Sequence, residues 1–372
     1  MKKLMMLVLV VVIVVVHLQS GQKQLDKPKK GDMVFKMDKV WEIEDAGEAP
    51  FASIRDLMVL EDGTAYIYDS KNLRIYIVSK EGKAVRAFGR MGEGPGEIRQ
   101  LRQAKLRRAG DKIVVQEDRR IHYFKRNGDF IRSQTVLEAQ NPILFLNENE
   151  TITAPIHLRQ IRNKRGIGKI RRINLKTGAQ SVIASFSMFK GGMSVSKSGG
   201  RATVTDTSLT PMMIITHFNG RLYYGMNDEY WITVSDLTGK RLNSFGIERK
   251  RRWISDKVKE DELIASAKDR APVELLKRLA KTMANEMNHF SNIEIHKGLL
   301  YVFTPYYVRN HRQQIDIFST GGTFLYRAFI ELDPELKMTR EPLIRNGFVY
   351  ISMENDEGDI TVAKYSIALP KA

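Results

Sequence analysis

The feature of this sequence that most constrains its fold is a unit of four short β-type runs that recurs along the chain. The first clear copy has runs at about residues 53–60, 64–69, 73–79 and 84–88. Asp62-Gly63 and Glu81-Gly82 lie between runs, and glycine allows the positive φ that tight hairpin turns require. The same order returns at residues 103–136, with Gly110 and Asn127-Gly128 in the turns. The spacing between equivalent glycines, about 40 to 50 residues, is typical of a repeated four-stranded unit.

Further copies of this unit follow at residues 142–185, 211–246 and 291–329, and a sixth begins near residue 340. The sixth copy has only three strands, whereas residues 34–44 form an extra strand before the first copy. Pairing of residues 34–44 with residues 359–367 would complete the last unit and remove an exposed edge. We therefore expect an all-β, six-bladed β-propeller over residues 34–372, closed by its N-terminal strand. Seven blades are the alternative count.

Two stretches interrupt the repeat. Residues 186–210 are rich in Gly and Ser and are interpreted as a long loop. Residues 248–288 carry a helical signal, because several apolar residues recur at helical spacing after Pro272: Leu275, Leu276, Leu279, Met283 and Met287. The pattern predicts a helical insertion of one or two helices between blades 4 and 5. We expect its apolar stripe to pack on the propeller, with a lid or docking role as the alternative.

The N-terminus carries an export signal in residues 1–22. Lys2 and Lys3 precede an unbroken apolar run, residues 4–16, which suits a signal peptide and is short for a membrane span. An uncleaved anchor through residues 4–16 is the alternative to cleavage. Residues 23–33 are polar and basic and are interpreted as a linker. The rest of the chain is expected outside the cytoplasm, either periplasmic or secreted.

Composition narrows the classes of partner and site. The 372-residue chain contains no cysteine, which excludes disulfides, thiolate metal sites and cysteine nucleophiles. Its net charge of +17 favours anionic partners. The basic residues are nevertheless spread along the chain, and export makes nucleic acid a poor partner, so no nucleic acid is expected. We expect a monomer.

One segment between the first two copies matches a known linker. Residues 88–98 read FGRMGEGPGEI and resemble the FGxxGxGPGxF linker of NHL-repeat-type propellers and related exported bacterial six-bladed propellers. Ile98 stands where the family has an aromatic residue. Repeated glycine suits a chain that must cross from one blade to the next. The resemblance implies a ligand-binding module or, as in a few NHL-type members, a lyase or metal-dependent hydrolase.

Histidines and carboxylates are the residue types in this chain that could act as catalytic or metal-binding groups. No two of the seven histidines have HxxxH or HExxH spacing. His157, His217 and His296 lie near inner-strand positions of three blades, and such a triad resembles the metal site of NHL-type amidating lyases. Ordinary strand or loop histidines are the alternative. The carboxylates Asp56, Glu117, Asp228 and Asp316, which would suit a calcium-dependent hydrolase, are interpreted as turn or surface residues.

A basic run in the third copy is a candidate anion-binding surface. It contains Arg159, Arg162, Lys164, Arg165, Lys169, Arg171 and Arg172. A solvated loop is the alternative interpretation of this run, and anion binding there would weaken with salt.

The sequence as a whole favours a binding or scaffold module over an enzyme. It contains no GxSxG elbow that would support a serine nucleophile. We expect an exported propeller that recognises a protein, peptide or glycan ligand without a cofactor. The alternative is a propeller lyase or hydrolase with a divalent metal, such as calcium or zinc, at its central channel.

Overall fold

The computed structural model describes residues 21, 23–99, 101, 104–117, 120–136, 142–155, 166–187, 211–267, 272–305 and 311–370. The chain divides into two compact units. Unit 1 comprises Met1–Asp32, Phe189–Pro305 and Asp316–Arg327, and unit 2 comprises Met33–Met188, Tyr306–Ile315 and Ala328–Ala372. The expected export segment, residues 1–22, lies outside the described residues except for Gly21. The expected loop, residues 186–210, also lies outside them, except that residues 186–187 are the end of a strand.

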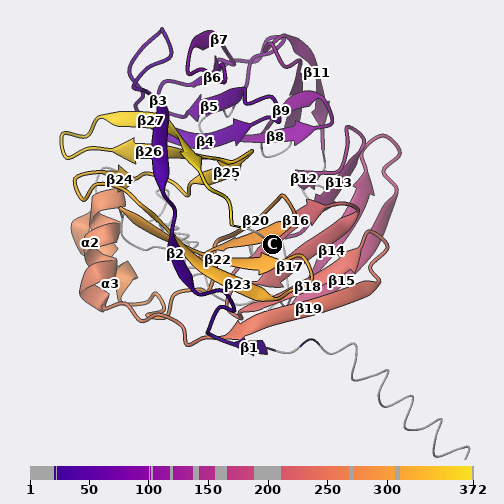
Figure 1. Cartoon of the computed structure of the whole chain (residues 1–372). Helices are drawn as coiled ribbons and strands as arrows, with labels where there is room; N and C mark the ends of the chain where they lie inside the picture. The colour runs from indigo at the N-terminus through magenta and orange to yellow at the C-terminus, as the bar shows by residue number, and fades with distance from the viewer. Residues whose placement is uncertain are drawn as a thin grey trace, which may run out of the picture. The chain divides into compact units, whose positions relative to one another are not determined.

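The first three blades are antiparallel sheets of four strands each, in chain order, within unit 2 (Figure 1). Blade 1 contains β4 (Ile54–Val59), β5 (Ala65–Asp69), β6 (Arg74–Val78) and β7 (Ala84–Phe88). Blade 2 contains β8 (Lys105–Ala109), β9 (Lys112–Gln116), β10 (Arg120–Phe124) and β11 (Phe130–Thr135). Blade 3 contains β12 (Pro142–Phe145), β13 (Glu150–Thr153), β14 (Ile167–Asn174) and β15 (Gln180–Ser187). The strands expected in blade 1 are confirmed to within one residue at each end.

The remaining blades repeat the pattern. Blade 4 contains β16 (Met213–Phe218), β17 (Arg221–Met226), β18 (Trp231–Asp236) and β19 (Arg241–Glu248). Blade 5 contains β20 (Asn292–His296), β21 (Leu299–Phe303), β22 (Arg312–Ser319) and β23 (Phe324–Glu331). Blade 6 contains β25 (Leu343–Arg345), β26 (Phe348–Glu354) and β27 (Ile360–Ile367), and the short β24 (Lys337–Met338) also pairs with β26.

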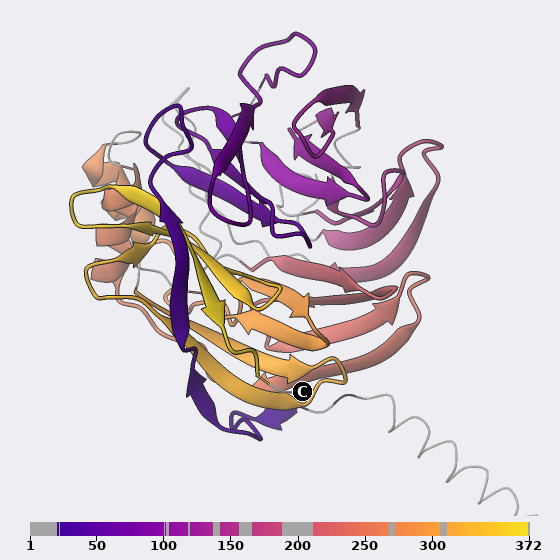
Figure 2. The same cartoon turned by 45° about the horizontal axis from the view of Figure 1, so that its top comes forward.

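Strand β3 (Met37–Ile43) supplies the missing strand of blade 6. It pairs antiparallel with β27, and Trp41 lies opposite Lys364. Figures 1 and 2 both show β3, in indigo, alongside the yellow β27. The predicted closure of the last blade by the N-terminal strand is therefore confirmed, and the chain forms six blades.

The segment expected to be a linker, residues 23–33, instead adds strands to two blades. Strand β1 (Lys23–Leu25) pairs parallel with β19, and β2 (Asp32–Val34) lies next to β23. The side-chain amide of Gln24 donates to the carbonyl of Gly322 at 2.6 Å and accepts from the amide of Phe324 at 2.9 Å. Polar side chains can thus dock at a sheet edge, where backbone groups are available for hydrogen bonding.

In blades 1, 2 and 5, the glycine of the last turn packs against an aromatic ring on the outer strand of the preceding blade. A Cβ atom built on any of these glycines would approach the ring to between 2.4 and 2.9 Å, which is too close for a real contact. Each of them also has a φ between 85° and 95°. The pairs are Gly82 with Trp41, Gly128 with Phe88, and Gly322 with Phe245. The turn glycines therefore serve blade packing as well as backbone geometry.

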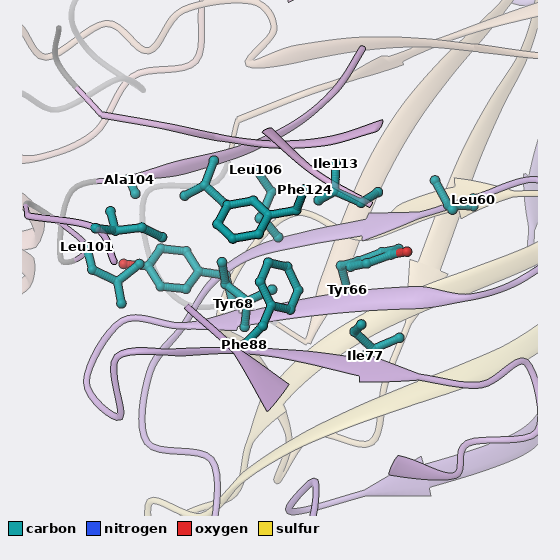
Figure 3. Close-up of a cluster of buried hydrophobic side chains, with 13 residues drawn as sticks. Leu60, Tyr66, Tyr68, Ile77, Phe88, Leu101, Ala104, Leu106, Ile113 and Phe124 are labelled. Atoms are coloured by element: carbon teal, nitrogen blue, oxygen red, sulfur yellow. The ribbon is translucent and has the colours of Figure 1, made fainter. Parts of the chain in front are cut away.

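A cluster of apolar side chains joins the first two blades. The rings of Phe88 on β7 and Phe124 on β10 lie 4.9 Å apart between centroids, next to the buried rings of Tyr66 and Tyr68 (Figure 3). Ile98 of the linker is fully buried in the same cluster. Ile98 therefore packs in the interface between blades 1 and 2.

The expected helical insertion is present as α2 (Asp256–Ala267) and α3 (Val273–Ala280), after the end of β19 and before β20. The buried side chains of Leu263, Leu276 and Leu279 pack together, so the apolar stripe of α3 faces α2. Beneath them, the fully buried Lys259 amine donates to the carbonyl of Met283 at 2.8 Å. No helix among the described residues is long and apolar enough to cross a membrane.

Candidate functional site

The blades of a β-propeller surround a central channel, and the first strand of each blade lies nearest to that channel. In this chain the first strands are β4, β8, β12, β16, β20 and β25. A ligand-binding site is therefore expected among side chains on these strands and on the segments that lead into them.

Two of the three predicted metal-binding histidines lie on such strands in unit 1. His217 is on β16 and His296 is on β20, and these strands contact each other. The Nε2 atom of His217 is buried and has no hydrogen-bond partner among the described residues. Burial lowers the pKa of His217, which favours the neutral imidazole that metals bind.

The third histidine, His157, lies outside the described residues. Among the residues that the structure describes, no group of three or more His, Cys, Asp or Glu side chains could hold a metal ion. The His157, His217 and His296 triad therefore stays a prediction.

The predicted basic surface is described only in part. Arg159, Arg162, Lys164 and Arg165 lie outside the described residues, whereas Lys169, Arg171 and Arg172 are on β14. Arg172 is already engaged, because its Nη2 atom lies 2.7 Å from Glu150 Oε1 on the adjacent strand. Lys169 is exposed and Arg171 is half-buried. The anion-binding role of this run remains a prediction.

Glu117 lies in the turn between β9 and β10, as one reading of it expected, but its side chain is buried and not at the surface. Glu117 Oε1 lies 2.8 Å from His122 Nε2 and also accepts the backbone amide of Arg99. The other ring nitrogen of His122 lies 2.9 Å from the hydroxyl of Ser133. This bridge joins β10 to β11, the two outer strands of blade 2, and holds the imidazole from both sides.

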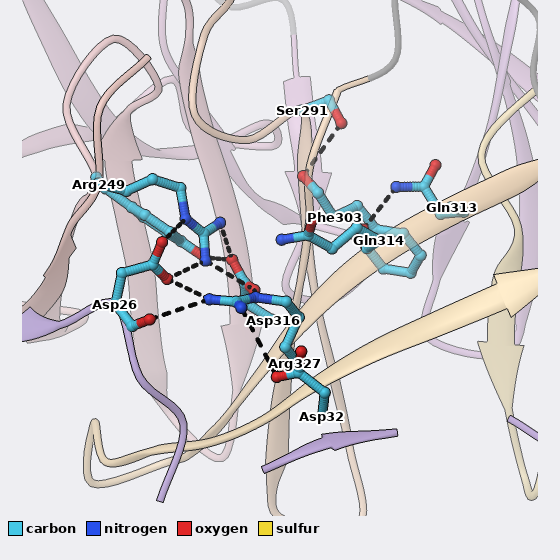
Figure 4. Close-up of polar contacts among 10 residues, drawn as sticks. Asp26, Asp32, Arg249, Ser291, Phe303, Gln313, Gln314, Asp316 and Arg327 are labelled. Carbon is cyan, nitrogen blue, oxygen red and sulfur yellow. Dashed lines mark hydrogen bonds and ion pairs between the residues drawn. The ribbon is translucent and has the colours of Figure 1, made fainter. Parts of the chain in front are cut away.

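Asp316 was also misassigned to the surface, because its side chain is fully buried in unit 1. It accepts a 2.5 Å hydrogen bond from the hydroxyl of Tyr230 and a 2.6 Å hydrogen bond from Arg249. Arg249 and Arg327 both bind Asp26, which follows β1 (Figure 4). Burial together with the charge of Asp316 raises the pKa of Tyr230, which therefore stays protonated. This network fastens the N-terminal segment to blades 4 and 5.

Asp56 has a different setting, on the first strand of blade 1 in unit 2. Its Oδ1 atom accepts the backbone amide of Leu57 at 3.0 Å and Arg340 Nη2 at 3.3 Å. Its Oδ2 atom accepts the backbone amide of Leu106 at 2.9 Å and lies 3.8 Å from Arg107 Nη1. This one carboxylate therefore links the first strands of blades 1 and 2 to the segment before β25.

Cations outnumber the carboxylate at this position. Arg55 on β4 and Lys105 on β8 are exposed, whereas Arg107 and Arg340 are 27% and 24% exposed at their side chains. Burial lowers the pKa of Arg107, and the charge of Arg340 lowers it further against the opposing effect of Asp56. We call these residues, Arg55, Asp56, Lys105, Arg107 and Arg340, the Asp56 cluster.

Sequence reasoning missed the Asp56 cluster, although a signal was present. Residues 54–59 and 105–109 each place charged side chains near the start of a short strand that also carries buried apolar residues. Charge in such first strands is unexpected unless it faces the channel. Recognising that both strands are first in their blades would have brought Asp56, Lys105 and Arg107 together.

Comparison with known proteins agrees with the fold. A model of the DUF5128 family, described as a six-bladed β-propeller, matches residues 32–183, which span β2 to most of blade 3. No curated protein matches the chain. The narrower resemblance to NHL-repeat-type propellers stays a prediction.

Two solved structures extend the comparison to most of the chain. A Bacteroides vulgatus member of the DUF4221 family shares 11% identity and a TM-score of 0.55, with 91% of this chain and 99% of that chain covered. A Bacteroides fragilis protein described as exported shares 11% identity and a TM-score of 0.45 over 91% and 99% of the two chains. At 11% identity the likeness to the Bacteroides vulgatus protein concerns fold alone. The six sheets, of four or five strands each, make this chain a six-bladed β-propeller, and its residues 32–183 are similar to the DUF5128 family.

Proposed function

We propose that this chain is an exported binding module that recognises a protein, peptide or glycan ligand through its first strands. The observation that carries the proposal is the position of certain unpartnered basic side chains. Among the described residues, His217, Arg340 and Arg345 have buried nitrogen atoms without a hydrogen-bond partner. All three lie on a first strand or in the segment that leads into one.

Unpartnered donors in these places favour binding over a purely structural role. A buried polar group without a partner costs about 1 to 3 kcal/mol, so a folded protein keeps few of them. A ligand bound at one of these strands would supply a missing partner there, and water would do so in its absence. By contrast, the buried carboxylates of Glu117 and Asp316, which lie away from the first strands, have hydrogen-bond partners.

Export rests on the N-terminal sequence, where Lys2 and Lys3 precede the apolar run at residues 4–16. The test is fractionation of cells that express the chain with a C-terminal tag, followed by measurement of the mature N-terminus. Recovery of the intact chain in the cytoplasm would refute export. A new N-terminus near Gly21 would establish cleavage, and an intact membrane-bound chain would establish the anchor.

Binding is tested by calorimetry on the purified mature chain with a neutral oligosaccharide, an oligogalacturonate and a mixture of tryptic peptides. We expect at least one of these to bind, and we expect Arg345→Gln to weaken that binding. Arg126→Gln is the matched control, because Arg126 is exposed in a hairpin turn of blade 2 and pairs with Asp62. Failure of all three ligand classes to bind the wild-type chain would refute the proposal.

A metal-dependent lyase or hydrolase is the second candidate function. It is favoured by one observation, the unpartnered Nε2 atom of His217 on a strand that contacts the strand of His296. Metal analysis of the purified protein tests it. Stoichiometric zinc or calcium that is lost in a folded His217→Ala variant would support the enzyme, and a metal content unaffected by that variant would reject it.

A further inference from the structure

We infer that the Asp56 cluster is a binding site for an oxyanion, namely a carboxylate, sulfate or phosphate group carried by a small ligand. The inference rests on the proposed binding function and assigns a chemical class to one part of the first-strand surface. It concerns unit 2 alone, because β4, β8 and the segment before β25 all belong to that unit.

The first argument is the balance of charge. The cluster contains four cations and one carboxylate, so it carries a formal excess of three positive charges. The charge of Arg340 lowers the pKa of Arg107. The charge of Arg107 in turn lowers the pKa of Lys105. Such mutual repulsion destabilises the cluster unless anionic charge enters it.

Asp56 cannot provide that charge to all four cations, because its oxygen atoms are already used. Two backbone amides and two arginines contact them at 2.9 to 3.8 Å. The carboxylate therefore acts as a positioning group. It fixes Arg107 and Arg340, each through one nitrogen atom of the guanidinium group.

The second argument is the unpartnered part of Arg340. One of its nitrogen atoms, Nη2, holds Asp56, whereas Nε and Nη1 are buried without a hydrogen-bond partner among the described residues. A guanidinium group presents its donors in a planar fork that matches oxyanions, so an oxyanion is the ligand that suits these donors best.

The third argument is access. Lys105 is exposed, yet the surrounding protein and Arg107 lower the pKa of its amine. A small anion could therefore reach Lys105 from solvent while contacting the half-buried arginines.

Local backbone geometry also supports a site at this position. The register between β4 and β5 shifts between Ile54 and Asp56, which makes Arg55 the extra residue of a β-bulge. Bulges change the direction in which a side chain projects and occur often beside functional sites. Here the bulged residue is Arg55, which is exposed beside the half-buried Asp56 on the first strand.

The test is calorimetric titration of the mature chain with sodium sulfate, sodium phosphate and sodium galacturonate, with chloride used to hold ionic strength constant. We expect one equivalent of at least one anion to bind. Lys105→Met and Arg340→Gln should each weaken that binding by about tenfold or more, since each removes a charge-assisted contact. Arg108→Gln is the matched control on the same strand, because Arg108 pairs with Glu61 outside the cluster.

The three anions distinguish between the kinds of ligand that could carry the oxyanion group. Tightest binding of galacturonate would assign the site to an acidic sugar, and tightest binding of phosphate or sulfate would assign it to the free or esterified inorganic group. Lys105 is exposed, so Lys105→Met should fold normally, and the circular dichroism spectrum and unfolding temperature of each variant verify this.

Two results would overturn the inference. One is the absence of binding by all three anions to the wild-type chain. The other is equal binding by the wild type, Lys105→Met and Arg340→Gln, which would locate the anion elsewhere. If a neutral oligosaccharide or a peptide still bound the chain in either case, the proposed binding function would stand while this site would be rejected.

Discussion

The closure of blade 6 makes a quantitative prediction about Trp41. This residue lies on β3, where its side chain is 8% exposed. Its indole Nε1 donates to the carbonyl of Lys80 at 3.0 Å, and its ring contacts Tyr350 edge to face at 6.0 Å between centroids. Gly82 packs against the same ring, because a Cβ atom built on this glycine would lie 2.7 Å from Trp41 Cγ. Trp41 therefore connects the strand that closes blade 6 to the turn of blade 1.

The expected cost of Trp41→Ala follows from this burial. A buried tryptophan removes roughly 200 Å² from water, and at about 25 cal/mol per Å² this corresponds to about 5 kcal/mol. The loss on substitution is smaller than this, because the alanine methyl group still buries some apolar surface and because a compact unfolded state already buries part of the tryptophan. We therefore expect the free energy of unfolding to fall by about 4 kcal/mol, which agrees with the range of about 3 to 5 kcal/mol for such truncations.

Urea denaturation followed by circular dichroism measures this loss. Trp253→Ala is the matched control, because the Trp253 side chain is 67% exposed and its removal should change stability by less than about 0.5 kcal/mol. If Trp41→Ala does not fold, Trp41→Phe provides a milder test with a smaller loss. Equal stability of the Trp41→Ala and Trp253→Ala variants would refute the view that β3 closes the fold through this side chain.

Three further predictions concern other contacts. Arg249→Met should lower the free energy of unfolding, measured by urea denaturation, by about 3 to 5 kcal/mol, because it leaves the buried Asp316 carboxylate without its closest cation. A double variant, Arg249→Met with Asp316→Leu, should recover part of this loss, because it also removes the buried carboxylate. Gly128→Ala should lower the unfolding temperature, because the new methyl group would meet Phe88 at 2.9 Å with φ at 86°. Burial and nearby arginines lower the pKa of His289 from 6.5 to about 4. The neutral His289 therefore contributes to the stability of the fold above pH 6.5, and this contribution is lost as the pH falls from 6.5 toward 4. The unfolding temperature should fall across this pH range, and His289→Gln should make that fall smaller.

Much of this fold could be predicted because each repeat contains local sequence signals, namely glycines in its turns and short apolar runs in its strands. Turn glycines such as Gly63, Gly110 and Gly128 do adopt positive φ in the structure, and the strands between them are short and apolar. The count of six blades followed from aligning those turns. The pairing of residues 34–44 with the last blade followed from a requirement of the architecture, since a three-stranded blade would leave an exposed edge.

The N-terminal strands β1 and β2 were missed for a physical reason. Each has only three residues, and neither shows the alternation of apolar and polar side chains that marks a half-buried strand. They are held by backbone pairing at an outer edge and by side chains such as Gln24 and Asp26. Neither contact leaves a hydrophobic pattern, so the segment resembles a polar linker in the sequence.

The Asp56 cluster shows why candidate sites in propellers are harder to predict than their blades. Arg55 and Asp56 are separated from Lys105 and Arg107 by one repeat, and from Arg340 by most of the chain. No local motif connects them, because the architecture rather than the spacing places first strands together. A search for sites in such a chain should therefore compare equivalent positions across repeats. Charged residues that occupy first strands, where a structural role alone would favour apolar or neutral side chains, are the ones that the fold brings to a shared surface.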